Sequence, residues 1–120
     1  MPFSYSIDSS RRLLLTKAWG ILSDADILAG AAEVRGDPGF DPTYSEIMDL
    51  CDVADIAMSP SIMAGIAGRS IFKPGVRRAF VTQNEMQFGM ARMFATFGAS
   101  RGHQWRVFRS TEDALLWLNE

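Results

Sequence analysis

The sequence has very few of the residues that build disulfides and metal centres. Its 120 residues include one cysteine, Cys51, and one histidine, His103. A single cysteine forms no internal disulfide and cannot build a cysteine-rich zinc site. Any metal site would need carboxylate ligands, and any catalytic triad would depend on His103. We interpret Cys51, in an apolar segment, as a small buried hydrophobe, and His103 as a solvated loop residue.

Long apolar runs and a strong net charge are also absent. No uninterrupted apolar segment approaches the roughly 18 residues that span a bilayer, and no basic stretch with an apolar run behind it opens the chain. The formal charge of −2 indicates no preference for nucleic acid. We therefore expect a cytoplasmic protein with no membrane span, no nucleic-acid partner and no cofactor.

The composition that is present is typical of one globular domain, which we place over residues 1–120. Hydrophobic residues make up 48% of the chain and charged residues 22%. The charge is unevenly distributed: residues 1–60 hold ten acids and four bases (−6), whereas residues 61–120 hold four acids and eight bases (+4). This bipolar pattern is compatible with head-to-tail contacts between molecules.

Alternating polar and apolar residues predict an edge strand from Phe3 to Asp8. A turn at 8–10 leads to an antiparallel return strand from Arg11 to Trp19. Further strands are predicted over residues 45–53, 78–83 and 104–109.

Helices are predicted after four capping residues, namely Ser23, Ser59, Asn84 and Ser110. The helix after Asn84 has a clear apolar face made of Met86, Met90, Met93, Phe94 and Phe97. The expected fold is α/β, with about four helices in the order ββαβαβαβα. Its five-stranded sheet is mixed but mostly parallel, with the first strand antiparallel.

The segment Ile47–Val53, followed by Ser59 and a helix, resembles the central strand and turn of STAS domains, the fold of anti-sigma-factor antagonists. The whole chain is most similar to the SpoIIAA-like, or STAS/SEC14-like, group of small bacterial proteins. The segments that carry this resemblance are Trp19-Gly20, 37–40, 88–92, 107–109 and 114–118.

The resemblance implies a non-catalytic, regulatory protein-interaction domain that forms a homodimer or binds another protein. STAS domains that switch partners are phosphorylated on a serine at this turn. In this sequence the motif falls on residues 57–60, where Met58 occupies the phosphoacceptor position and has no hydroxyl. The usual phosphoserine switch is therefore not expected, and Ser59 and Ser61 are the neighbouring hydroxyls that could replace it.

The alternative function is a carrier of a small apolar or lipid-like molecule, because SEC14-like relatives hold lipids between the sheet and the helices. The side chains expected to line such a cavity are Trp19, Met58, Met63, Phe72 and Trp105. One core of this size has little room for a large cavity. No nucleophile, base and orienting group can be named together, so an enzyme is not expected.

Two clusters of charged residues are candidate sites. Acids at the strand ends could bind magnesium (Asp24, Asp26, Asp49, Asp52 and Asp55), but helix capping and solvation explain them better. Four bases could bind an anion (Arg69, Lys73, Arg77 and Arg78), but we interpret them as a solvated loop.

Phe88 lies on the far side of its predicted helix from Met86, with Arg92 one turn later. Large aromatic and arginine side chains dominate the energetics of interfaces. The sequence therefore predicts a contact surface centred on Phe88 and Arg92.

Overall fold

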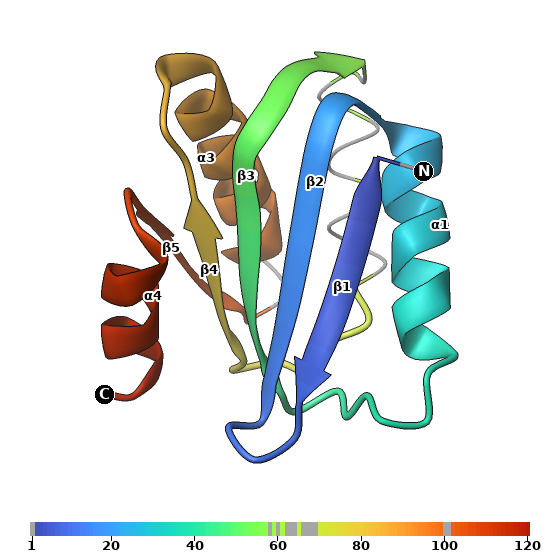
Figure 1. Cartoon of the computed structure of the whole chain (residues 1–120), viewed down its shortest axis with the longest axis vertical. Helices are drawn as coiled ribbons and strands as arrows, with labels where there is room; N and C mark the ends of the chain where they lie inside the picture. Colours follow the sequence, from blue (N-terminus) through green and yellow to red (C-terminus); the bar gives the residue numbers. More distant parts are fainter. Residues whose placement is uncertain (1, 58, 60, 62–64, 66–69, 100–101) are drawn as a thin grey trace.

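The computed structural model describes residues 2–57, 59, 61, 65, 70–99 and 102–120. Five strands and three helices lie in this part of the chain (Figure 1). In chain order they are β1 (Phe3–Asp8), β2 (Leu13–Ser23), α1 (Asp24–Arg35), β3 (Ser45–Ala57), β4 (Arg77–Val81), α3 (Glu85–Ala99), β5 (Gln104–Phe108) and α4 (Thr111–Leu118).

The strands form one sheet in which the spatial order follows the chain order, β1-β2-β3-β4-β5. β1 pairs with β2 antiparallel, and all the other neighbours are parallel. The predicted α/β class, the five-stranded mixed sheet and the antiparallel first strand are confirmed.

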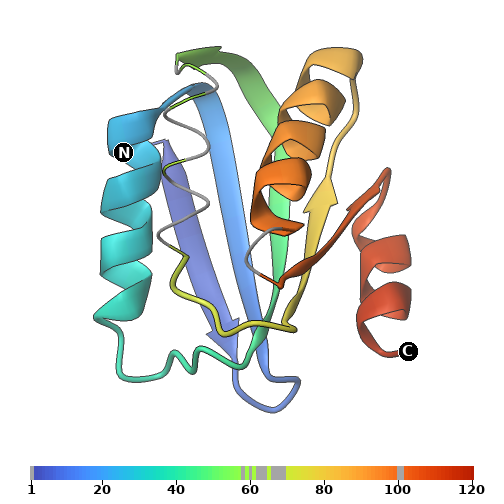
Figure 2. The ribbon, with the colours of Figure 1, turned by 180° about the vertical axis from the view of Figure 1, so that it is seen from behind.

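Helices cover both faces of the sheet, but unequally. α1 and α3 pack on one face, where Met90 and Phe94 of α3 join Leu50 and Phe80 in a buried cluster (Figure 2). α4 packs on the other face, where its Trp117 joins a second cluster. α4 contacts β3, β4 and β5. Figure 1 shows that no helix of the described part of the chain lies in front of β1 and β2 on this side.

Side-chain caps set the starts of the helices. The Ser23 hydroxyl accepts the Asp26 amide at 3.2 Å, and the Asp26 carboxylate accepts the Ser23 amide at 3.1 Å, which completes a capping box. Asn84 and Ser110 accept the amides of Gln87 and Asp113. These three predicted caps are confirmed.

β2 and β3 are longer than predicted. β2 continues past Trp19 to Ser23, because Gly20 adopts φ +67° at an irregularity in the pairing with β3 and lets the strand go on. The glycine that follows the predicted end of the strand thus keeps β2 paired with β3 across this irregularity.

The helix predicted after Ser59 lies for the most part outside the described residues. In the part of the chain that the structure describes, no helix is both long enough and apolar enough to cross a membrane.

Candidate functional site

A buried ion pair joins the neighbouring strands β3 and β4 on the face of the sheet that carries α1 and α3. Glu46 of β3 and Arg78 of β4 are register partners, and the guanidinium donates through Nε and Nη2 to Glu46 Oε1 at 2.9 and 2.7 Å. The Thr16 hydroxyl of β2 donates to Glu46 Oε2 at 3.2 Å. The side chains of Glu46 and Arg78 are only 4% and 12% exposed.

Aromatic rings hold the Arg78 guanidinium in place. Its Cζ atom lies 4.3 Å from the ring centroid of Phe72 and 3.9 Å from that of Trp105, both within the range of cation–π attraction. Trp105 itself stacks on Phe80 at 4.7 Å. The arginine is therefore fixed by a carboxylate and two rings, which favours one buried geometry.

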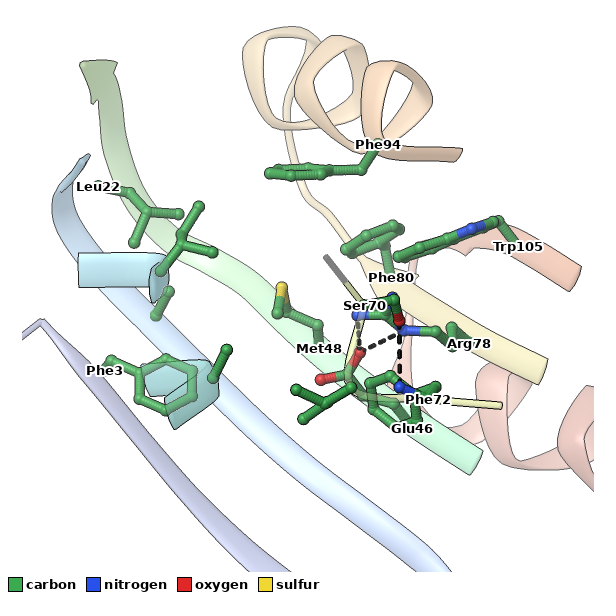
Figure 3. Close-up of a pocket in the computed structure, with 14 residues that line it drawn as sticks. Phe3, Leu22, Glu46, Met48, Ser70, Phe72, Arg78, Phe80, Phe94 and Trp105 are labelled. Atoms are coloured by element: carbon green, nitrogen blue, oxygen red, sulfur yellow. Dashed lines mark hydrogen bonds and ion pairs between the residues drawn. The ribbon is translucent and has the colours of Figure 1, made fainter. Parts of the chain in front are cut away.

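Beside this pair lies a cavity of about 80 Å³ that is mostly apolar. Figure 3 shows Glu46, Arg78, Phe72 and Ser70 close together on one side of it and Phe3, Leu22 and Phe94 around the rest. A ligand pocket for a drug-sized molecule is usually at least about 300 Å³. The cavity has room for a few water-sized groups.

The prediction that His103 is a solvated loop residue is wrong. It is 6% exposed, and its Nε2 lies 3.4 Å from the Phe72 carbonyl oxygen. Burial lowers the pKa of His103, and the nearby positive charge of Arg78 lowers it further. The loop folds back because the Gly75 amide donates to the Gly102 carbonyl at 2.7 Å, a tertiary contact with no local sequence signal.

Two of the five residues predicted to line a ligand cavity do line this one, namely Phe72 and Trp105. Trp19 does not, because its neighbour Ala18 faces the cavity and adjacent strand residues point to opposite faces. Trp19 is 37% exposed on the open side of β2. Met58 and Met63 lie outside the described residues.

The prediction of a solvated basic loop is wrong for Arg77 and Arg78. Both belong to β4, where they point to opposite faces of the sheet. Arg77 donates to the Trp117 carbonyl at 2.7 Å and lies over its ring. Arg78 is buried with Glu46. These two cations therefore do not converge on one anion, and Arg69 lies outside the described residues.

The acidic residues serve local structure. Asp26 belongs to the capping box, Asp49 accepts the Cys51 amide at 2.9 Å, and Asp52 pairs with Lys17 at 3.0 Å. Among the described residues, no three histidine, cysteine or carboxylate side chains come together.

Cys51 is half-buried on the α4 side, where it joins the cluster around Trp117. Burial raises the pKa of its thiol to about 11, with Asp49 adding to the shift. A thiol that stays protonated is a poor nucleophile.

The other predicted positions lie on the surface. Ser59 and Ser61 are exposed with their hydroxyl oxygens 3.0 Å apart. Phe88 is 36% exposed on α3, and the Arg92 guanidinium lies 5.7 Å from the centroid of its ring.

The sequence interpretation missed Glu46 and Thr16. Glu46, Met48 and Leu50 are every second residue of β3 and therefore share its inner face. The strand period alone thus places the Glu46 carboxylate in the core. A buried carboxylate needs a partner. Identifying Arg78 as that partner requires the strand register, which the sequence pattern does not contain.

A solved structure of the same fold matches nearly the whole chain. It is an uncharacterised protein of the DUF3478 family, with a SpoIIAA-like fold, from Shewanella loihica PV-4. The identity is 20%, the TM-score is 0.67, and the match covers 97% of this chain and 93% of that one. The fold is SpoIIAA-like. The resemblance inferred from the sequence is thus confirmed at the level of the fold.

Comparison with family models and with curated proteins gave no match. The SpoIIAA-like fold therefore rests on the agreement of architecture over the whole chain.

Proposed function

We propose that this chain is a non-catalytic protein-interaction domain of STAS type that acts as a cytoplasmic homodimer. The SpoIIAA-like fold supports the domain type, and the outer face of α3 supports self-association. Glu85, Phe88, Gly89 and Arg92 are all exposed on that face. At 100° per residue they lie within an arc of about 100°.

The order of these residues is self-complementary. A two-fold axis between Phe88 and Gly89 would run two copies of α3 antiparallel and bring Glu85 of each copy opposite Arg92 of the other. The same axis places Phe88 against Gly89 of the other copy. An isologous dimer needs this kind of reciprocal pairing, and it is the observation that carries the proposal.

Gly89 suits this arrangement, because among the described residues a Cβ atom here would have no neighbour within 4 Å beyond the adjacent residues and the backbone of its own helix. The position is open and lets another surface approach the backbone closely. The cation–π contact with Arg92 holds the Phe88 ring, so little side-chain entropy remains to be lost on binding.

Two further observations support an interaction domain over the carrier. The cavity of about 80 Å³ is far smaller than a lipid-like ligand needs. The two charged side chains that line it, Glu46 and Arg78, already neutralise each other. We further propose that the domain works without the usual phosphoserine switch, because Met58 offers no hydroxyl.

Charge reversal on α3 tests the dimer. Glu85→Arg and Arg92→Glu would each place like charges opposite one another, so we expect each to weaken dimerisation more than tenfold. The double variant restores opposite charges and should again have twice the 13.3 kDa mass of the monomer. Native mass spectrometry and light scattering measure this mass.

Two more variants sharpen the test. Gly89→Leu fills the space that Phe88 of the other copy would occupy, so it should give a monomer. This variant should be at least as stable as the native chain, because leucine is a better helix former than glycine. Glu112→Gln, on α4, is the control and should remain dimeric. If Glu85→Arg and Arg92→Glu both keep the native mass, this face of α3 is not the dimer interface.

A further inference from the structure

β1 forms an edge of the sheet, and some of its backbone hydrogen-bonding groups face away from β2. The Trp19 amide donates to the Pro2 carbonyl at 3.2 Å, which makes this cross-strand pair a hydrogen-bonded one. The two kinds of pair alternate along an antiparallel ladder. With the register Phe3↔Ala18 to Asp8↔Leu13, every second residue of β1 therefore turns its backbone away from β2.

The residues whose backbone N–H and C=O groups face away from β2 are Phe3, Tyr5 and Ile7. Within the described part of the chain, none of their outward N–H and C=O groups has a hydrogen-bond partner. β1 has no lysine, proline or bulge over its six residues, so it lacks several common devices that protect an edge strand.

An open groove of about 570 Å³ runs beside this edge. The middle and end of β1 form one wall, and Glu33 of α1, Asp37 and Gly39 form the other. A groove between an edge strand and a helix is the setting in which an extended peptide adds a strand to a sheet.

The groove carries negative charge, and its described lining includes no basic residue. Among the described residues that line it, only Glu33 and Asp37 have charged side chains. The Tyr5 hydroxyl and the Gly39 amide donate to Asp37 at 2.8 Å each. These bonds lower the pKa of Asp37 and keep the carboxylate charged. Asp8, at the end of the strand, is neutralised by Arg11 at 2.7 Å.

We infer that the β1 edge and this groove bind an extended, basic segment of a partner protein as a sixth strand. Alternate side chains of that strand would face Glu33 and Asp37, so they should be lysine or arginine. The others would lie beside Ser4 and Ser6 and should be small or polar. A second copy of this chain fits poorly, because β1 against β1 would bring two sets of these carboxylates together.

A labelled peptide that alternates lysine and threonine is the probe. Fluorescence anisotropy with the full chain should show saturable binding that Glu33→Lys weakens about tenfold. A peptide of the same composition with its lysines in one block should bind several-fold more weakly, because only alternation matches the strand period. Glu112→Lys on α4 makes the same charge change elsewhere and should leave the affinity unchanged.

Amide hydrogen exchange identifies the edge directly. The peptide should slow exchange at Tyr5 and Ile7 without slowing it at exposed amides of α4. Equal binding of both peptides, or no change at Tyr5 and Ile7, would overturn the inference. Protection of these amides that rises with protein concentration, without peptide, would instead assign the edge to self-association. The α3 variants test a different surface, so the two proposals can fail separately.

Discussion

At the scale of single residues, the charges of Glu46 and Arg78, buried between β3 and β4, carry a desolvation cost. Burial lowers the pKa of Arg78, while the adjacent Glu46 carboxylate raises it and so favours the charged form. Removing one member of such a pair leaves a buried, uncompensated charge. Thr16 and the surrounding aromatic rings compensate for the burial of these charges only when Glu46 and Arg78 are both present.

We therefore expect Glu46→Leu and Arg78→Met each to lower the free energy of unfolding by about 3–5 kcal/mol. The double variant should lose much less than the sum, because both charges leave together. Urea denaturation of all four proteins measures this coupling. Losses that simply add would show that the two side chains act independently.

His103 should make the stability depend on pH. Its folded pKa is lowered from the ordinary 6.5, so the unfolded chain binds more protons in the window between the two pKa values. The free energy of unfolding should thus be constant above 6.5 and fall as the pH drops below it. Arg78 and Glu46 are the charges acting on the ring, and Arg78 has the larger effect.

Melting temperatures between neutral pH and about pH 5 measure this effect. His103→Gln should flatten the profile in that range while leaving the steeper loss at lower pH, where carboxylates titrate. A native profile that is already flat there would show that His103 titrates normally.

At the scale of elements, local chemistry predicted the helix starts well and the strand lengths poorly. Ser23, Asn84 and Ser110 cap within their own turns, so a few residues of sequence contain the whole signal. The extension of β2 past Gly20 depends on the partner strand β3, which lies far along the chain.

A contact between α1 and β1 gives a prediction at this scale. Replacing glycine by alanine inside a helix usually stabilises by about 1 kcal/mol. At Gly30 of α1, however, a Cβ atom would lie 2.8 Å from two ring carbons of Phe3. We expect Gly30→Ala to destabilise the protein by about 1 kcal/mol, because overpacking outweighs helix propensity.

A smaller side chain at position 3 provides the control. In a Phe3→Leu background, Gly30→Ala should become neutral or stabilising in urea denaturation. If the sign is the same in both backgrounds, the ring is not what limits this position.

At the scale of the whole molecule, the order of β and α segments predicted the architecture, but not the candidate site. Amphipathic periods and caps act locally, and short parallel crossovers then leave few possible topologies. The cavity and the ion pair join residues from β2, β3, β4 and β5. His103 shows the limit clearly: its loop sequence is polar, and only its return onto residue 75 buries it.

The matching order of strands in space and along the chain bears on synthesis at the ribosome. No strand has to enter between two that are already paired, since each one joins the open side of its predecessor. The sheet can therefore assemble from its N-terminal hairpin while later segments are still being made. A stalled chain would expose two edges to aggregation, the lasting one at β1 and that of its newest strand, and the next β-α unit would cover only the latter.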